Sequence, residues 1–242
     1  MCIRDRSKAI VLHSIKYGET SLIVNCFLYD LGIKSFMVKG VLNSKNKKFS
    51  KSYFLPLSII YITYSIKTNK DLGYITEAKP AQIYTSLHID LFKSSVVVFI
   101  GELLNSVLKE SPGSNQKLFQ YLEYSLTWFD KSNKVSNFHL KVLIDLTRFI
   151  GFYPNIKEES HAFFDLNSGT TLEVKPSKDY IQNPELKKFK ELLGTTFEDL
   201  NTMKLNNVLR AKMLSIMIDY YSLHLQMFNS PKSIHVFNEV FK

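Results

Sequence analysis

A run of lysines in the first third of the chain is the group of side chains best suited to binding chemistry. Four of them stand within seven residues: Lys45, Lys47, Lys48 and Lys51. Ammonium groups bind phosphate oxygens as point charges and show no preference for the attached bases. Two more lysines lie at the ends of the apolar segment that precedes the run, Lys34 and Lys39. We expect these six side chains to form one surface for a polyanion, with two second-tier candidates, Lys16 and Lys67.

The net charge of the chain is concentrated in the same region. Residues 1–80 hold 13 Lys and Arg against 5 Asp and Glu, a balance of +8 out of +9 for all 242 residues. Residues 81–242 hold 18 against 17 and are nearly neutral. A basic module joined to a neutral one is typical of a protein that binds nucleic acid with one part. Four aromatic residues near the lysines could stack on bases, and we expect about half of them to be core: Phe36, Phe49, Tyr53 and Phe54.

The sequence lacks the residue spacings of common catalytic and metal sites. Its six histidines are scattered, and none forms the H-x-x-x-H or H-E-x-x-H pair that holds a metal on a helix. Two cysteines, Cys2 and Cys26, are too few for a four-thiolate zinc site. We therefore expect no enzyme activity, no metal and no cofactor. Cys26 lies in an apolar strand pattern, which predicts a buried reduced thiol.

The start of the chain carries no secretory signal pattern, and no apolar stretch approaches the ~20 residues of a membrane span. These features predict a cytoplasmic protein without a membrane partner. The opening segment Met1–Arg6 does not fit the strand pattern that begins near Lys8. We predict that residues 1–7 are a non-native or disordered leader.

Five short segments rich in β-branched and aromatic residues come after the leader, separated by turn signals. Together they span residues 8–80 and enclose one long basic loop, which predicts a small five-stranded barrel of the oligonucleotide-binding (OB) type. Periodicity alone also allows an SH3-like barrel. The expected strands are Lys8–His13, Ser21–Leu28, Gly32–Val41, Leu57–Lys67 and Leu72–Glu77.

Beyond Lys79-Pro80 the apolar period changes to that of helices, so residues 81–242 are predicted to form a helical domain. The junction is short and holds no Gly/Ser run, which favours tight packing against the barrel. An irregular segment or short hairpin is expected at Glu158–Lys178, and a terminal strand or short helix at Ile234–Val240. The five expected helices are His88–Lys109, Asn115–Phe129, Ser136–Ile150, Pro184–Leu193 and Lys204–Phe228.

Several segments in this order resemble the RecO family of bacterial recombination mediators. The barrel region contains Tyr17-Gly18-Glu19-Thr20, Val38-Lys39-Gly40-Val41 and Leu55-Pro56-Leu57. The helical region contains Phe149-Ile150-Gly151-Phe152-Tyr153-Pro154, Phe164-Asp165-Leu166 and Tyr220-Tyr221-Ser222-Leu223-His224. The resemblance extends from about Lys8 to Lys242.

The resemblance implies a protein of DNA repair that turns over no covalent bond. Its barrel would bind single- and double-stranded DNA, and it would anneal complementary strands in association with the nucleoid. Its helical domain would dock the acidic C-terminal tail of single-stranded-DNA-binding protein, SSB. With RecR it would displace SSB and so help RecA to load.

The chain departs from many members of this family, which carry a four-cysteine zinc site after the Gly-x-x-Pro segment. Asn155–Pro176 contains no cysteine, so the resemblance is to zinc-less forms, and packing through Phe163, Phe164 and Leu166 would have to hold the segment. An SSB tail ends in an aromatic residue and needs an apolar pocket beside a cation. Our candidates for that pocket share one predicted helix: Phe138, Lys141 and Arg148.

The residues leave two other functions open. One is an OB-type module of RNA metabolism, such as a tRNA or rRNA chaperone, which would prefer structured RNA over single-stranded DNA. The other is a nuclease using acidic residues of the helical domain, which would shorten its substrate in a metal-dependent reaction. The absence of a catalytic spacing favours the mediator and the RNA-binding module over the nuclease.

Overall fold

The computed structural model describes residues 2–43, 48–67, 71–133 and 136–235, and two compact units account for them. Unit 1 comprises residues 1–131 with 231–233, and unit 2 comprises residues 132–230 with 234–242. The prediction placed a boundary at Lys79-Pro80, where strands give way to helices. Packing instead groups the first two helices with the barrel, because they cover part of its wall.

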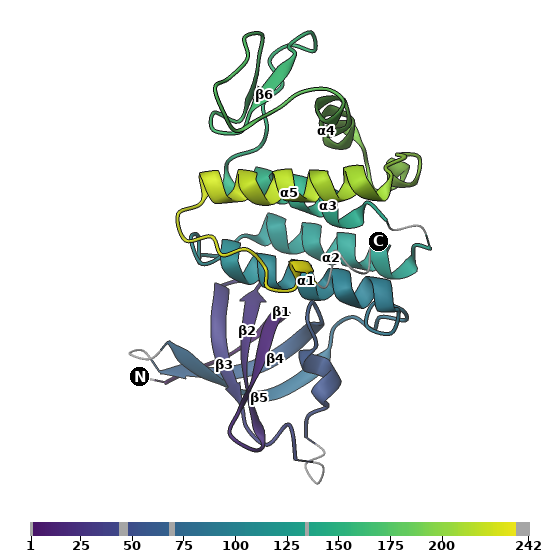
Figure 1. The fold of residues 1–242 in the computed structure, drawn as a ribbon. Coiled ribbons are helices and arrows are strands. Elements are labelled where there is room, and N and C mark those ends of the chain that lie inside the picture. The colour runs from purple at the N-terminus through teal and green to yellow at the C-terminus, as the bar shows by residue number, and fades with distance from the viewer. Residues whose placement is uncertain (1, 44–47, 68–70, 134–135, 236–242) are drawn as a thin grey trace. The chain divides into compact units, whose positions relative to one another are not determined.

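Unit 1 contains a closed five-stranded barrel, as the sequence predicts (Figure 1). Its strand order is β1-β2-β3-β5-β4; β1 closes the ring by pairing with β4, and β3 pairs with β5 in parallel. This is the arrangement of the OB-type barrel. The strands are β1 (Cys2–Tyr17), β2 (Ser21–Leu28), β3 (Gly32–Val38), β4 (Ile59–Lys67) and β5 (Leu72–Pro80).

Alternation along the strands fills the barrel with apolar side chains. Phe36 and Tyr64 are both buried, and their ring centroids lie 5.3 Å apart inside the barrel. Gly73 makes room for them, since a Cβ at that position would come within 2.8 Å of the Phe36 ring. Cys26 is fully buried, and burial raises the pKa of its thiol to about 12. The prediction of a buried reduced thiol at Cys26 is confirmed.

The first strand is much longer than the sequence predicts. β1 begins at Cys2, and its residues 2–7 pair with residues 62–67 of β4. Residues 2–7 are therefore part of the barrel wall in the structure, where the sequence had indicated a non-native or disordered leader. Residues 2–7 hold two apolar residues followed by three charged ones, so the sequence shows no strand alternation there that could reveal a strand without its partner.

Two helices pack against the barrel within unit 1. Figure 1 shows α1 (Leu91–Val107) across one end of the strands with α2 (Gln116–Lys131) beside it. Helix α1 approaches β1 closely at Gly101, where an added Cβ would lie only 2.7 Å from the Leu12 carbonyl oxygen. The backbone N–H of Ile33 also donates to the Pro112 carbonyl oxygen, at 3.1 Å. Within unit 1, the first helix after the junction thus packs closely against the barrel, and the prediction for the rest of the helical region stays a prediction.

A buried carboxylate fixes the connection between the barrel and α1. The Asp130 side chain, near the end of α2, accepts hydrogen bonds from the backbone N–H groups of Thr85, Ser86 and Leu87 at 2.8–3.1 Å. Burial by itself raises the pKa of Asp130, but these bonds outweigh it and lower the pKa to about 2. The Lys93 ammonium group completes the cluster by donating to the Asp130 carbonyl oxygen at 2.8 Å.

Unit 2 is built on three helices and a small sheet. Helices α3, α4 and α5 pack on one another, and a three-stranded sheet of order β7-β6-β8 comes after α3 in the chain. With α1 and α2, the described residues contain the five helices that the sequence predicts, each within a few residues of its expected bounds. The elements are α3 (Phe138–Ile150), β6 (Phe163–Asp165), β7 (Thr170–Leu172), β8 (Tyr180–Ile181), α4 (Glu185–Gly194) and α5 (Asn207–His224).

The cysteine-free segment after α3 is held by aromatic packing, as expected. Phe164 is fully buried, with ring centroids 4.9 Å from Phe189 and 6.0 Å from Tyr220. Leu166 is buried, and Phe163 packs edge-on against Tyr180 at 5.7 Å. The terminal element predicted at Ile234–Val240 lies almost entirely outside the described residues.

Candidate nucleic-acid interface

The described part of the basic loop between β3 and β4 is anchored by its aromatic residues and exposes two lysines. Phe49 and Phe54 are buried in the barrel core, with ring centroids 6.1 Å apart. A short 3₁₀ helix, η1 (Lys51–Phe54), starts at Ser50, whose hydroxyl oxygen accepts from the Ser52 N–H at 3.3 Å. Lys48 and Lys51 lie beside these anchors and are exposed. Lys45 and Lys47 lie outside the described residues.

This anchoring corrects one expectation about the aromatic residues. Three of the four candidates for base stacking are core residues, Phe36, Phe49 and Phe54, rather than the expected half. Tyr53 is partly buried and also packs against the core. Closing the barrel end requires bulky apolar side chains, so these rings stabilise the loop and are inaccessible to a base.

Lys34 lies beside a hollow of about 710 Å³ at one end of the barrel. Two other cations line the same hollow: the second-tier candidate Lys67, and Lys109, which comes just after α1. Asp5 and Asp71 also line it, so the positive potential there is partly offset. The sequence could not indicate Lys109, because it lies 75 positions along the chain from Lys34.

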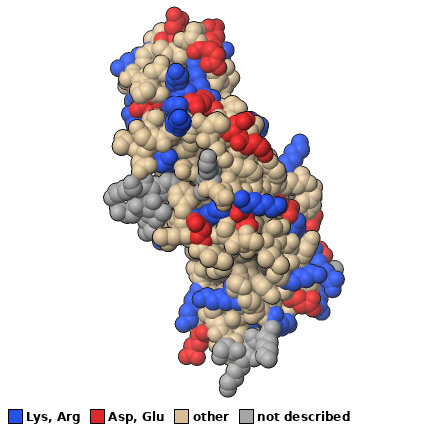
Figure 2. All heavy atoms as spheres, turned by 90° about the vertical axis from the view of Figure 1, so that its right-hand side faces the viewer, with Lys and Arg blue, Asp and Glu red and all other residues tan. Residues whose placement is uncertain are grey.

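The other second-tier candidate, Lys16, lines a separate hollow of about 410 Å³ together with Lys51. Lys39 lies elsewhere, where its ammonium group is 5.0 Å from the centre of the exposed Tyr74 ring. Figure 2 likewise shows Lys and Arg side chains on the barrel in separate groups divided by uncharged surface. The described lysines are thus exposed as predicted, but they surround the barrel instead of forming one patch.

Sequence reasoning missed a row of residues on the outside of β1, β4 and β5. Lys8, Tyr61 and Lys79 are direct cross-strand neighbours in the barrel register. Tyr61 is 46% exposed, and the ammonium groups of Lys8 and Lys79 lie 5.9 Å and 5.7 Å from its ring centre. The one feature of the sequence that could have indicated an outward-facing Tyr61 was strand alternation, because Tyr61 stands between the inward-facing Ile60 and Ile62.

The helix residues proposed for an SSB tail do not form a common surface in unit 2. Phe138 is fully buried, and its ring centroid is 5.6 Å from that of Phe197. Lys141 is also buried and pairs with Asp145 at 2.7 Å. Arg148 alone is exposed, with its guanidinium group 4.4 Å from the Tyr153 ring centre. The geometry therefore gives no support to a pocket built from all three, because α3 is covered on most of its surface.

The part of the chain that the structure describes contains neither a cluster for a metal ion nor a helix for a membrane span. No group of three or more His, Cys, Asp or Glu side chains there could hold a metal ion. No helix there is long and apolar enough to cross a bilayer. The arrangement that remains is a barrel with exposed cations and tyrosines, which suits contacts with phosphates and bases.

Two family models together match nearly the whole chain. Residues 2–84 match the family model described as recombination protein O N terminal, and residues 88–233 match recombination protein O C terminal. The chain is 38% identical over 236 residues to the DNA repair protein RecO of Flavobacterium psychrophilum, covering 98% of both chains. It is 37% identical over 235 residues to that of Christiangramia forsetii, covering 97% of this chain and 98% of the relative. The chain therefore belongs to the RecO family and has a role in DNA repair.

Proposed function

We propose that this chain is a non-enzymatic recombination mediator that binds single- and double-stranded DNA through its barrel. The observation that carries the proposal is the set of exposed lysines held at fixed positions around a closed OB-type barrel, within a DNA repair family. The described members of that set are Lys34, Lys39, Lys48 and Lys51, and Lys45 and Lys47 belong to the same proposed surface. Lysines at separate positions contact phosphates along a path and leave base edges free, which annealing requires.

Loss of charge should weaken DNA binding and lower its salt dependence together. Replacing Lys34, Lys39, Lys48 and Lys51 with Gln should reduce the slope of log K against log [salt] by about 0.7 for each lost contact to single-stranded DNA. The matched control is Lys187→Gln, an exposed lysine on α4 in unit 2. An unchanged affinity and slope in the fourfold variant would show that DNA binds elsewhere.

The proposal includes partners that fit the mediator role. RecR would join this protein in displacing SSB, RecA would load on the DNA thus exposed, and the complex would work at the nucleoid in the cytoplasm. The acidic SSB tail would dock on the helical part. Arg148 beside Tyr153 supports such a contact, since a guanidinium group next to a ring offers a cation and an apolar surface. Arg148→Glu should abolish binding of a labelled tail peptide measured by fluorescence anisotropy, while Lys187→Gln should not.

Annealing of SSB-coated DNA tests the function as a whole. Two complementary oligonucleotides would be coated with SSB, either intact or lacking its last residues, and mixed with the protein. Annealing that depends on the tail supports both the DNA surface and the SSB contact. Equal annealing with intact and truncated SSB would refute docking of the SSB tail but would leave the proposal of DNA binding intact. No annealing, together with preferential binding of structured RNA, would replace this function with that of an RNA-binding module.

A further inference from the structure

We propose that the outer face of β1, β4 and β5 is a second binding track on the barrel, on which bases of single-stranded DNA stack against Tyr61 and Tyr74. The proposal rests on DNA binding by the barrel and assigns selectivity for unpaired strands to two tyrosines. We call this surface the tyrosine face and define it by Lys8, Tyr61, Lys79, Tyr74 and Lys39.

The barrel register places both tyrosines on the outside of the same strand pair. Tyr61 stands between Ile60 and Ile62, which face the core, and Tyr74 stands between Gly73 and Ile75. Tyr61 lies opposite Lys79, and Tyr74 lies opposite Ser65. Tyr61 and Ser65, the residue opposite Tyr74, are four positions apart on β4, which is roughly 13 Å along a strand at about 3.3 Å per residue.

Each ring is accessible and lies beside a cation. Tyr61 is 46% exposed and Tyr74 is 37% exposed. Lys79 lies 5.7 Å from the Tyr61 ring centre and Lys39 lies 5.0 Å from the Tyr74 ring centre. An exposed ring next to an ammonium group is the arrangement that proteins use to bind unpaired strands, with stacking for the base and charge for its phosphate.

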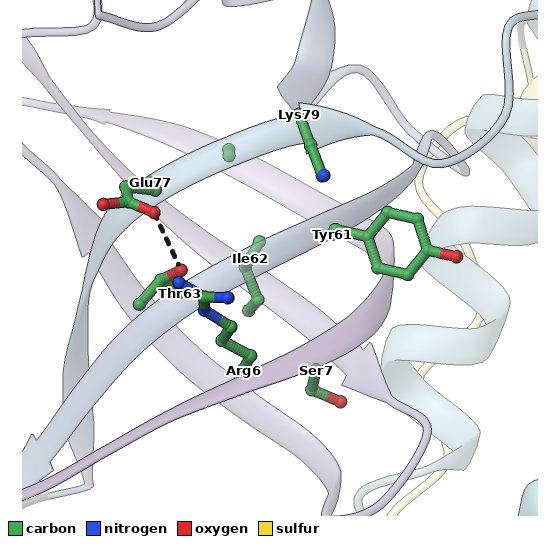
Figure 3. A pocket seen from close by; sticks show the side chains of 8 residues that line it. Arg6, Ser7, Tyr61, Ile62, Thr63, Glu77 and Lys79 are labelled. Atoms are coloured by element: carbon green, nitrogen blue, oxygen red, sulfur yellow. Dashed lines mark hydrogen bonds between the residues drawn. The ribbon is translucent and has the colours of Figure 1, made fainter.

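The surface around Tyr61 forms a groove of about 510 Å³. Figure 3 shows that Tyr61 and Lys79 come from neighbouring strands, with Thr63 and Glu77 further along the same groove. The Thr63 hydroxyl donates to the Glu77 carboxylate at 3.1 Å, which fixes that acceptor between the two tyrosines. Arg6 also lines the groove and is exposed, so it adds a cation to this surface.

Glu77 determines how a strand would lie in the groove. A carboxylate repels a phosphate but accepts hydrogen bonds from the N–H donors of an unpaired base, such as the amino group of cytosine or the ring N3–H of thymine. Bases would therefore face the sheet, with the sugar-phosphate backbone displaced toward the lysines. Lys8 pairs with Glu123 of α2, so Arg6, Lys79 and Lys39 would supply most of the charge. Bases within a duplex cannot turn toward the sheet, so this site selects unpaired strands.

Substitution of Tyr61 tests this site without changing any of the four lysines replaced in the fourfold variant, one of which, Lys39, also belongs to the tyrosine face. Tyr61→Leu should weaken binding of a 20-nucleotide oligo(dT) between about fivefold and 100-fold, from the value of one stacked base. Its affinity for duplex DNA should stay within about twofold of wild type. Tyr61→Phe should bind as wild type does, because it keeps the ring. The matched control is Tyr17→Leu, a tyrosine that is 53% exposed at the far end of β1.

A direct signal comes from placing an indole at the same position. In a Trp128→Phe background, Tyr61→Trp should lose fluorescence when oligo(dT) is added, since stacking quenches an indole, and should change little with duplex. This site is overturned, and the proposed function stands, if Tyr61→Leu binds both DNA forms as wild type does, the fluorescence of Tyr61→Trp changes with neither form, and the fourfold lysine variant loses affinity for both. A wild-type protein that binds no DNA would refute both.

Discussion

The carboxylate of Asp130 should be one of the main supports of unit 1, and Asp130→Asn tests it. The side chain accepts three backbone N–H bonds and two hydroxyl bonds from Thr85, Ser86 and Leu87. An amide has only one oxygen to accept them, and its NH₂ group would face the same donors. The variant thus leaves partly buried donors unsatisfied at the junction between barrel and helices.

The expected magnitude follows from the pKa. The pKa of Asp130 is about 2 in the folded protein against 3.8 for the free side chain, which corresponds to about 2 kcal/mol of stability. Because the folded pKa is depressed, this stability is fully present above pH 3.8 and is lost as the pH falls through about 2. Asp130→Asn should therefore reduce the free energy of unfolding by about 2 kcal/mol at pH 7, and the deficit should shrink toward zero near pH 2.

Fluorescence offers a local assay, because the chain has one tryptophan and it is Trp128 on α2, two residues before Asp130. Urea unfolding followed by this fluorescence, at a series of pH values between 7 and 2, gives the free energy of unfolding for each variant. The matched control is Glu19→Gln, an exposed carboxylate in the turn after β1, which should change stability by less than about 0.5 kcal/mol. A deficit in Asp130→Asn that is absent at pH 7, or that stays constant down to pH 2, would refute the reasoning.

Two further perturbations test the packing of unit 1. Gly32→Ala should lower the free energy of unfolding by more than about 2 kcal/mol, because φ is +73° and a Cβ would lie 2.1 Å from the Pro112 carbonyl oxygen. Gly18→Ala, where φ is +60° and nothing lies within 4 Å, should lower it by about 1 kcal/mol. Equal losses in thermal or urea unfolding would contradict the close approach at Gly32. In a Cys2→Ser background, Cys26 should react with a thiol reagent at pH 8 only as fast as the protein opens, since burial raises its pKa to about 12. Labelling in native buffer as fast as in denaturant would show that the barrel core is accessible.

The sequence alone determined most of the strand and helix pattern and the distribution of charge along the chain. Ser21–Leu28 was predicted with its final bounds, because β-branched residues between two turn signals leave little choice of conformation. The excess of lysine in residues 1–80 identified the barrel as the basic part, since charge is a sum over residues and requires no coordinates. The lack of cysteine in residues 155–176 likewise indicated a segment held by packing, which Phe164 bears out.

The tertiary structure decided which side chains share a surface. Lys8, Tyr61 and Lys79 are far apart in sequence, and only the pairing of β1, β4 and β5 places them in one row. Burial was equally hidden on α3, where Phe138 and Lys141 look available in the sequence but are buried in the structure. A pattern of residues reports the period of a strand or helix. Register and the packing of distant elements decide which faces meet solvent, and those depend on contacts that a linear sequence does not contain.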